Sequence, residues 1–197
     1  MKDFDLIISQ ICRSFGELRK AGLEPVSDAG TPRAAVAVLV RDNNGVAEML
    51  VIQRAENPMD HWSGHLALPG GRASSEDTDL IDTAIREVYE EVGLALDRHQ
   101  SIIGQLEDLS PQSPRLPPIV IRPFVAVCRS DAEITFSHEV AHAFWIPIAL
   151  LRREGPMLTY KLTIEGSDQS WPAFNSEKGP IWGITQRIIS TFLSALD

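Results

Sequence analysis

Two apolar runs that flank an Asn-Gly pair constrain the fold of this chain more than any other feature. The runs cover residues 34–41 and 47–54 and are rich in alanine, valine, leucine and isoleucine. Asn44-Gly45 lies in the short connection between them. This pair favours the tight turn of a β-hairpin, because both residue types tolerate a positive φ. The sequence therefore predicts two antiparallel strands joined by a short turn.

Helical and strand-like segments continue along the rest of the chain. Apolar residues recur at helical spacing over 3–20, which predicts an amphipathic first helix. The other expected elements are a short strand at 65–69, a helix at 79–92, strands at 101–107, 119–128 and 141–146, a helical turn at 148–152, a strand at 160–164 and a closing helix at 180–196. This order predicts an α/β or α+β fold, with a mixed β-sheet sandwiched between helices.

The length of 197 residues suits one domain with a core of ordinary size. We assign residues 1–32 to the first helix and a polar linker at 25–32, packed on the domain, and residues 33–197 to the domain itself. The first helix has an apolar face that fits either this domain or a second subunit. The sequence is therefore also compatible with a homodimer.

The composition excludes several classes of function. A formal net charge of -9 argues against a surface built for nucleic acid, which needs clustered lysine and arginine. No apolar run approaches the roughly 20 residues that span a bilayer. The first residues lack the pattern of a signal peptide, so the cytoplasm is the expected compartment. Cys12 and Cys128 lie far apart in the sequence and are expected to be buried thiols in a reducing environment.

Three glutamates crowd one side of the expected helix at 79–92. Glu87, Glu90 and Glu91 fall within an arc of about 100° on a helical wheel. Glu87 and Glu91 repel each other across one turn, and all three lie late in the helix, where its dipole disfavours anions. A solvated acidic face is one explanation. The other is a metal site, since Mg²⁺ and Mn²⁺ prefer a few carboxylate oxygens.

The stretch around these glutamates resembles the Nudix box, the loop–helix–loop signature of the Nudix hydrolases. Residues 86–94 match the family pattern Arg-Glu-U-x-Glu-Glu-x-Gly-U, where U is aliphatic, at every specified position. Leu68-Pro69-Gly70-Gly71 is similar to the entry turn of the family. In the first half, Gly71 and Arg86 are one residue further apart than in the general pattern. The glutamate of that half falls near Asp77, Thr78 or Asp79.

The longer spacing is similar to the coenzyme A pyrophosphatase branch of the family. Other segments also resemble that branch, so that the resemblance extends from about residue 33 to 195; they are 50–55, 64–71, 139–151 and 181–189. One segment departs from it. The branch carries an arginine between Arg54 and Gly64, whereas residues 56–63 read Glu-Asn-Pro-Met-Asp-His-Trp-Ser. An arginine there would suit the 3′-phosphate of the coenzyme. Its absence leaves that role to another lysine or arginine, or to none.

The resemblance implies a Nudix fold and a hydrolase that splits a nucleoside diphosphate linked to another group. It implies Glu87, Glu90 and Glu91 as ligands of Mg²⁺ or Mn²⁺, with the carbonyl of Gly70 as a candidate fourth ligand. The metal would neutralise the diphosphate and activate a water molecule. Arg86 is expected to orient a carboxylate by bidentate pairing.

Other site residues follow from residue type and position. The general base is expected among the box glutamates, Glu90 and Glu91, or at Glu139 in the late matched segment. Arg54 and Arg72 are candidates for phosphate contacts. Trp182, near the start of the closing segment, is expected in the core.

The expected partner is a small nucleoside diphosphate derivative, with neither nucleic acid nor membrane involved. Coenzyme A or one of its derivatives is the leading substrate. A dinucleotide, an ADP-sugar or a modified nucleotide is the alternative, and a non-catalytic nucleotide-binding module is a third reading.

Overall fold

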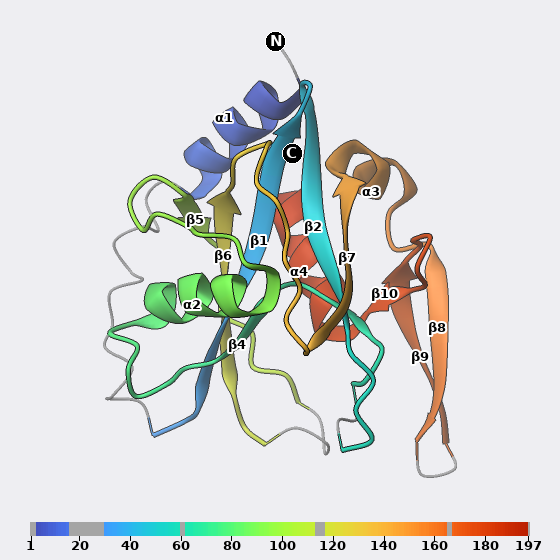
Figure 1. Ribbon diagram of the computed structural model, residues 1–197. Helices are drawn as coiled ribbons and strands as arrows, with labels where there is room; N and C mark the ends of the chain where they lie inside the picture. Colours follow the sequence, from blue (N-terminus) through green and yellow to red (C-terminus); the bar gives the residue numbers. More distant parts are fainter. Residues whose placement is uncertain (1–2, 16–29, 60–61, 113–116, 165–166, 197) are drawn as a thin grey trace.

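The computed structural model describes residues 3–15, 30–59, 62–112, 117–164 and 167–196. Figure 1 shows its elements along the chain. They are α1 (Asp3–Phe15), β1 (Arg33–Asn43), β2 (Val46–Arg54), β3 (Leu66–Ala67), β4 (Gly70–Arg72), α2 (Leu80–Val92), β5 (Ile102–Gln105), β6 (Val120–Val127), β7 (Val140–Pro147), α3 (Ile148–Glu154), β8 (Leu158–Ile164), β9 (Ser167–Phe174), β10 (Ile181–Trp182) and α4 (Gly183–Ser194).

The main sheet is forked at one end. Along one edge, β1 pairs in parallel with β6. Its other edge is shared, because residues 40–43 pair with β2 while residues 34–36 pair with β4. In the same way β2 divides one edge between β1 and β3, and β7 occupies the other. The two central strands therefore separate at this end, and the segment Leu66–Arg72 fills the space between them. This arrangement places Gly70 and Gly71 at the end of the sheet.

Helices cover both faces of the main sheet, as Figure 1 shows. On one face α2 packs against alternating residues of β1 and their neighbours; this cluster contains Ala35, Ala37, Leu39, Leu80, Ala84, Val88, Val92 and Phe124. On the other face α1, α3 and α4 pack; this cluster contains Ile7, Ile11, Val38, Val40, Met49, Ile148, Leu151, Ile188 and Phe192. The alternation follows from the two-residue period of a strand. The predicted mixed sheet between helices is confirmed.

The first helix packs on this chain's own core. Ile7 and Ile11 are fully buried, and the amide of Gln10 donates to the carbonyl of Leu196 at 2.6 Å. The end of the expected helix, at 16–20, and most of the expected linker at 25–32 lie outside the described residues. Both cysteines are free, but Cys12 is exposed and Cys128 is only partly buried, so the expected burial is wrong for Cys12 and incomplete for Cys128. No helix in the described ranges is long and apolar enough to cross a bilayer.

The late part of the chain differs from the sequence prediction. A three-stranded antiparallel sheet, β8–β9–β10, lies beside the main sheet, and of its strands only β8 was expected. Residues 181–182 pair with β9 instead of beginning the closing helix. The helix starts at Gly183, three residues later than expected, and the φ of 67° at this glycine allows the sharp change from strand to helix. β9 has no clear apolar alternation, and its pairing with β8 decides its conformation.

Candidate active site

α2 carries the acidic cluster and is fixed at both ends. The side chain of Asp79 accepts hydrogen bonds from the backbone N–H groups of Ile81 and Asp82, which caps the N-terminus. Gly93 ends the helix with a φ of 70°, in the left-handed conformation that glycine favours, as predicted. The buried face of α2 packs on the sheet. The direction of each glutamate is therefore set by the core.

Glu91 is buried against the end of the sheet. Its residue is only 4% exposed, and its Oε2 accepts a hydrogen bond of 2.9 Å from the backbone N–H of Gly70. Burial raises the pKa of Glu91 from its ordinary value of 4.5 to about 7, although the Gly70 bond acts in the opposite direction. An anionic Glu91 is thus costly in the metal-free protein, and a nearby cation would relieve that cost.

Glu87 lies one turn earlier, directly over Gly71. A Cβ atom added at Gly71 would come within 2.5 Å of the Glu87 carboxyl, so this carboxyl occupies the space that a side chain would need. Burial raises the pKa of Glu87 as well, partly offset by Arg86. Two adjacent glycines therefore contact two carboxylates of α2 from the end of the sheet.

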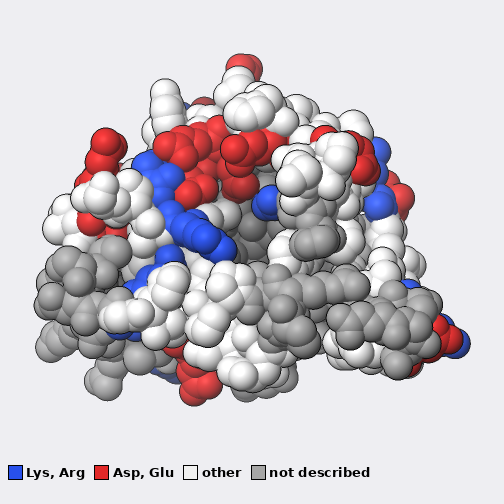
Figure 2. All heavy atoms as spheres, turned by 90° about the horizontal axis from the view of Figure 1, so that it is seen from below, with Lys and Arg blue, Asp and Glu red and all other residues white. Residues whose placement is uncertain are grey.

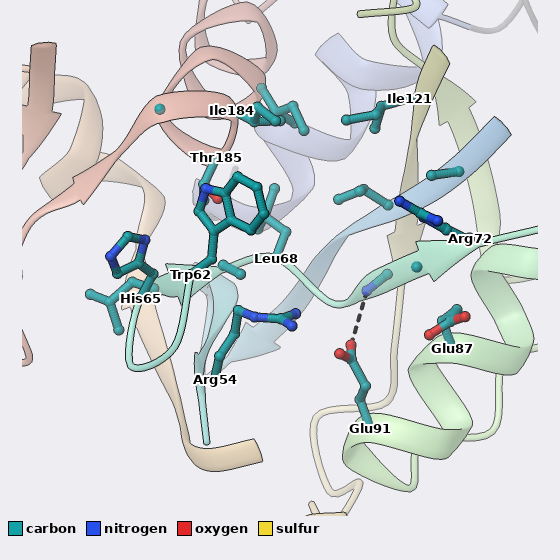
Figure 3. Close-up of a pocket in the computed structure, with 18 of the residues that line it drawn as sticks. Arg54, Trp62, His65, Leu68, Arg72, Glu87, Glu91, Ile121, Ile184 and Thr185 are labelled. Carbon is teal, nitrogen blue, oxygen red and sulfur yellow. Dashed lines mark hydrogen bonds between the residues drawn. The ribbon is translucent and has the colours of Figure 1, made fainter. Parts of the chain in front are cut away.

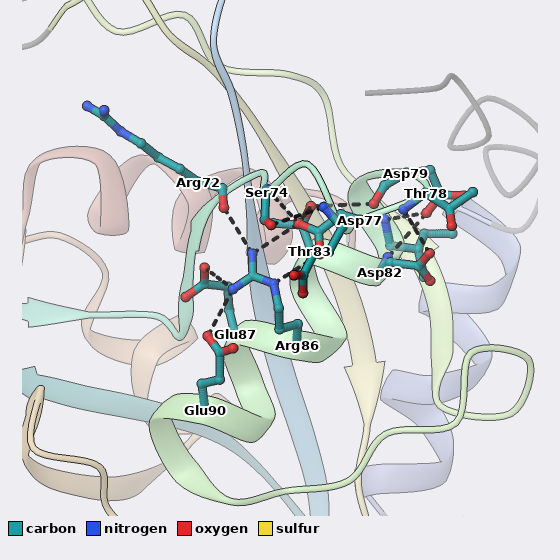
Figure 4. Close-up of polar contacts among 12 residues, drawn as sticks. Arg72, Ser74, Asp77, Thr78, Asp79, Asp82, Thr83, Arg86, Glu87 and Glu90 are labelled. Atoms are coloured by element: carbon teal, nitrogen blue, oxygen red, sulfur yellow. Dashed lines mark hydrogen bonds and ion pairs between the residues drawn. The ribbon is translucent and has the colours of Figure 1, made fainter. Parts of the chain in front are cut away.

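Arg86 connects the two halves of the Nudix-like motif. Its Nε and Nη2 donate to the two oxygens of Asp77 at 3.0 Å each, and its Nη1 donates to Glu87 at 2.8 Å and to Glu90 at 2.9 Å. A second bond from Nη2 reaches the carbonyl of Arg72 at 3.0 Å. All five donors of the guanidinium are used (Figure 4). The side chain positions acidic residues and leaves no donor for a substrate.

Asp77 is the acidic residue in the first half of the motif that pairs with Arg86. Its side chain is only 4% exposed. Burial alone would raise the pKa of Asp77, but hydrogen bonds from Arg86, the backbone of Ser74 and Thr83 together lower it. Of the other residues near the expected glutamate position, Asp79 instead caps α2 and pairs with Arg98.

A cavity of about 550 Å³ opens beside these carboxylates. Glu87, Glu91, Glu139, Arg54 and Arg72 line one end of it, together with Gly70 and Gly71. In Figure 3 the guanidinium of Arg54 points toward Glu91, and Arg72 extends from the opposite side above Glu87. In the end view of Figure 2, acidic side chains gather at one rim of a hollow with basic side chains beside them. Such a mixture suits an anionic substrate bound through cations.

Sequence reasoning missed two other walls of the cavity. Trp62, His65 and Trp182 line one wall. The ring of Trp182 lies 5.1 Å from that of His65 in an edge-on arrangement, and it stacks at 4.4 Å on Tyr160, which does not line the cavity. Trp182 is therefore a partly exposed lining residue, and its expected place in the core is wrong. The third wall is aliphatic and includes Ile121 and Ile184. No local signal in the sequence indicates that these distant segments meet.

The predicted site residues divide into two groups. Gly70, Arg54, Arg72, Glu87, Glu91 and Glu139 line the cavity. Glu90 does not line it; its side chain is 56% exposed and its carboxylate is bonded to Arg86. Arg86 also lies behind the lining.

The donor set fits a hard divalent cation. Among the described residues no three Asp, Glu, His or Cys side chains stand close enough together to form an assembled cage. However, Glu87 and Glu91 supply carboxylate oxygens at the cavity wall. Glu90 lies on the same helix, and Nη1 of Arg86 donates one hydrogen bond to Glu90 and another to Glu87, so the two carboxylates share this donor. Mg²⁺ and Mn²⁺ bind few carboxylates and keep positions for water and phosphate, which matches an open wall rather than a closed cage.

Changing Gly71 and Gly70 to alanine should affect different properties: Gly71→Ala should weaken Mg²⁺ binding, and Gly70→Ala should destabilise the fold. In Gly71→Ala the new methyl group displaces the carboxyl end of the Glu87 side chain, which can move because it is the far end of a flexible side chain. Stability should change by less than about 1 kcal/mol, while Mg²⁺ affinity falls by roughly 10–100-fold. In Gly70→Ala the methyl group would lie 2.3 Å from the carbonyl oxygen of Ala35 at a φ of 153°. That change should destabilise the fold by about 1–3 kcal/mol. Thermal unfolding and calorimetric Mg²⁺ titration measure both, and equal unfolding effects would contradict the assignment of Glu87 to the Gly71 wall.

Comparison with known protein families identifies one match along most of the chain. The NUDIX domain matches residues 31–163. A mitochondrial coenzyme A diphosphatase of Homo sapiens is 28% identical over 92% of this chain and 78% of its own length. A Nudix hydrolase of Yersinia enterocolitica is 32% identical over 72% of this chain and 70% of its own length. The chain spans only 33% and 59% of the length of two relatives from Schizosaccharomyces pombe that it also matches.

Solved structures support the fold. A MutT/nudix family protein from Enterococcus faecalis superposes with a TM-score of 0.62, at 21% identity, over 92% of this chain and 68% of that chain. At this identity the similarity concerns the arrangement of sheet and helices alone.

Proposed function

The chain belongs to the Nudix family, and from this premise we propose that it hydrolyses the diphosphate bond of a nucleoside diphosphate joined to a second group, with coenzyme A or a derivative as the leading substrate. Water adds across the P–O–P bond. The products are a nucleoside monophosphate and the phosphorylated second group.

One observation carries the proposal: a buried carboxylate, Glu91, and a partly buried one, Glu87, line a cavity whose same end carries two arginines. Glu91 is held by the Gly70 N–H, Glu87 lies over Gly71, and Arg54 and Arg72 line the same end. A diphosphate needs positive charge around its oxygens, and the arginines supply part of it. The carboxylates would repel a diphosphate unless cations lie between them, so their presence argues for a metal-dependent reaction.

We assign Glu87, Glu90, Glu91 and the carbonyl of Gly70 as ligands of Mg²⁺ or Mn²⁺. When bound, the metal supplies charge neutralisation and a water of lowered pKa. Arg86 is assigned a positioning role, since it holds Glu87 and Glu90 through one nitrogen and anchors them to Asp77. Arg54 and Arg72 are assigned to the phosphates, which bind guanidinium groups well.

We place the general base among Glu90, Glu91 and Glu139. Glu139 lines the cavity just before β7 and its side chain is 63% exposed, so it is accessible to a water molecule in the cavity. Glu91 has the raised pKa that suits proton transfer near neutral pH, but a ligand of the metal would lose that property. Turnover and Mg²⁺ affinity of Glu139→Gln, Glu90→Gln and Glu91→Gln separate these assignments, because loss of the base lowers kcat at unchanged Mg²⁺ affinity, whereas loss of a ligand lowers both.

A substrate panel tests the proposal. Coenzyme A, NADH, dinucleoside polyphosphates, ADP-sugars and nucleoside diphosphates are each incubated with Mg²⁺ and with Mn²⁺, and release of monophosphates is measured. We expect the highest kcat/KM with coenzyme A or an acyl derivative. Preference for a dinucleotide, an ADP-sugar or a modified nucleotide would replace the substrate and keep the chemistry. Binding without metal-dependent turnover of any substrate would favour a non-catalytic nucleotide-binding module.

Dephospho-coenzyme A adds a sharper comparison to the panel. Residues 56–63 contain no arginine or lysine. A charge-assisted bond to the 3′-phosphate would change kcat/KM by more than about 10-fold. We expect the two forms of the coenzyme to differ by less than that.

A further inference from the structure

The cavity contains an aliphatic compartment that the diphosphate chemistry does not use. Six apolar side chains from β1, the β3–β4 connection, the β6 region and α4 form it: Val36, Leu68, Ile119, Ile121, Ile184 and Ile188. Leu68, Ile119, Ile121 and Ile188 are at most 7% exposed and continue directly into the main core cluster. In Figure 3, Ile184 and Ile121 lie across the cavity from Arg54 and Glu91, with Leu68 between the two ends.

The place of the compartment restricts what can fill it. It begins where the charged end stops, because Leu68 precedes Gly70 by two residues. A group that enters it must therefore be attached to the diphosphate through a very short link. The whole cavity, at about 550 Å³, holds a diphosphate and one flanking group, and the rest of a larger substrate must extend outside.

An aliphatic wall discriminates between the two kinds of group that commonly flank a diphosphate. The terminal ribose of ADP-ribose, on the side of the diphosphate away from the adenosine, carries several hydroxyls. These hydroxyls would lose their hydrogen bonds to water if they lay against Ile121 and Ile184. A branched alkyl group loses nothing and gains contact with the wall.

We propose that this compartment binds a branched alkyl group attached next to the diphosphate, as in the pantoyl part of coenzyme A, whose two methyl groups are one carbon away from the phosphorylated CH₂. This inference rests on the proposed diphosphate hydrolysis and names what selects its substrate. The aliphatic compartment, rather than a contact with the 3′-phosphate, gives the preference for coenzyme A over ADP-ribose.

Isosteric substitutions at Ile184 test this selection. Threonine and valine have nearly the same shape, so Ile184→Thr and Ile184→Val differ chiefly by a hydroxyl in the compartment. Ile184 is partly exposed near the start of α4, which makes both variants tolerable for folding. We expect kcat/KM for coenzyme A to be at least about 10-fold lower in Ile184→Thr than in Ile184→Val. For ADP-ribose the two variants should agree within about 3-fold, since a hydroxyl group suits a sugar.

A second pair and a binding measurement complete the experiment. Ile121→Thr and Ile121→Val probe the part of the same aliphatic wall that β6 contributes, and thermal unfolding tests whether each variant is folded. Calorimetric titration with the products 4′-phosphopantetheine and ribose 5-phosphate measures the same discrimination without turnover. Compared with the valine variants, the threonine variants should bind 4′-phosphopantetheine more weakly and ribose 5-phosphate equally well.

The outcomes separate this inference from the proposed function. Equal losses with coenzyme A and ADP-ribose would mean that the compartment holds the shared adenosine, and no loss with either would mean that substrate does not touch it. Both results overturn the inference while leaving hydrolysis intact. A wild-type protein that hydrolyses ADP-ribose but not coenzyme A would overturn the substrate assignment itself.

Discussion

Glu91→Gln is expected to lower kcat/KM with every substrate by at least about 100-fold, because second-sphere changes at metal sites already cost up to that much and this change removes a proposed ligand. The amide keeps the size of the side chain, and its oxygen can still accept the hydrogen bond from Gly70. The loss should therefore come without unfolding. Mg²⁺ affinity, measured by calorimetry, should fall together with turnover.

The same variant should be more stable than the wild type at neutral pH when no metal is present. The folded-state pKa of Glu91, about 7, lies above its ordinary value of 4.5. Below pH 4.5 the group is protonated in both states and costs nothing. As the pH rises toward 7 the unfolded chain loses this proton first, so the folded state loses stability. The loss is complete above pH 7 and amounts to roughly 3 kcal/mol.

Glutamine cannot ionise, so Glu91→Gln should lack this dependence. Denaturant unfolding in EDTA at pH 4.5 and pH 8 measures it for both proteins. Glu76→Gln is the matched control, since Glu76 is an exposed glutamate of the same loop–helix motif. Mg²⁺ should increase the free energy of unfolding of the wild type more at pH 8 than at pH 6, because a ligand must be deprotonated to bind metal. An identical pH dependence in the wild type and Glu91→Gln would show that Glu91 is not desolvated.

The parts of the molecule that were predictable from sequence depend on local signals. The hairpin at Asn44-Gly45, the helix at α2 and its stop at Gly93 each follow from residues close in sequence. The crowding of three glutamates was also visible, because a helix fixes their relative directions. The motif resemblance then narrowed their purpose to metal binding.

The differences among those glutamates were not predictable. On a wheel they share one arc, but only Glu87 and Glu91 face the Gly70–Gly71 segment, which the fork of the main sheet brings to α2. Glu90 lies beyond that segment and pairs with Arg86. The aliphatic compartment combines side chains of β6 and α4, such as Ile121 and Ile184, which are 63 positions apart in the sequence. Periodicity along one segment carries no information about such contacts.

Arg86→Lys is expected to destabilise the protein by about 2–3 kcal/mol, which corresponds to a lowering of Tm by roughly 4–12 °C. Lysine has the same charge but only three donors at one point, so it cannot bond to both oxygens of Asp77 and also to Glu87 and Glu90. The side chain of Asp77 is 4% exposed, and its carboxylate would remain buried with fewer partners. Thermal unfolding measures this effect.

Charge alone cannot explain the expected loss, and Arg129→Lys provides the matched control. Arg129 also pairs bidentately with an aspartate, Asp131, but both side chains are largely exposed, and its replacement should cost less than about 0.5 kcal/mol.

Mg²⁺ affinity, measured well below the Tm, gives a readout that a purely structural role would not change. We expect it to fall roughly 10–100-fold in Arg86→Lys, because Glu87 and Glu90 lose their shared donor. Wild-type Mg²⁺ affinity in a destabilised Arg86→Lys would mean that Arg86 supports only the fold. Because the guanidinium links Asp77 to the two glutamates, the extra residue in the first half of the motif is tolerated as long as Asp77 still reaches it.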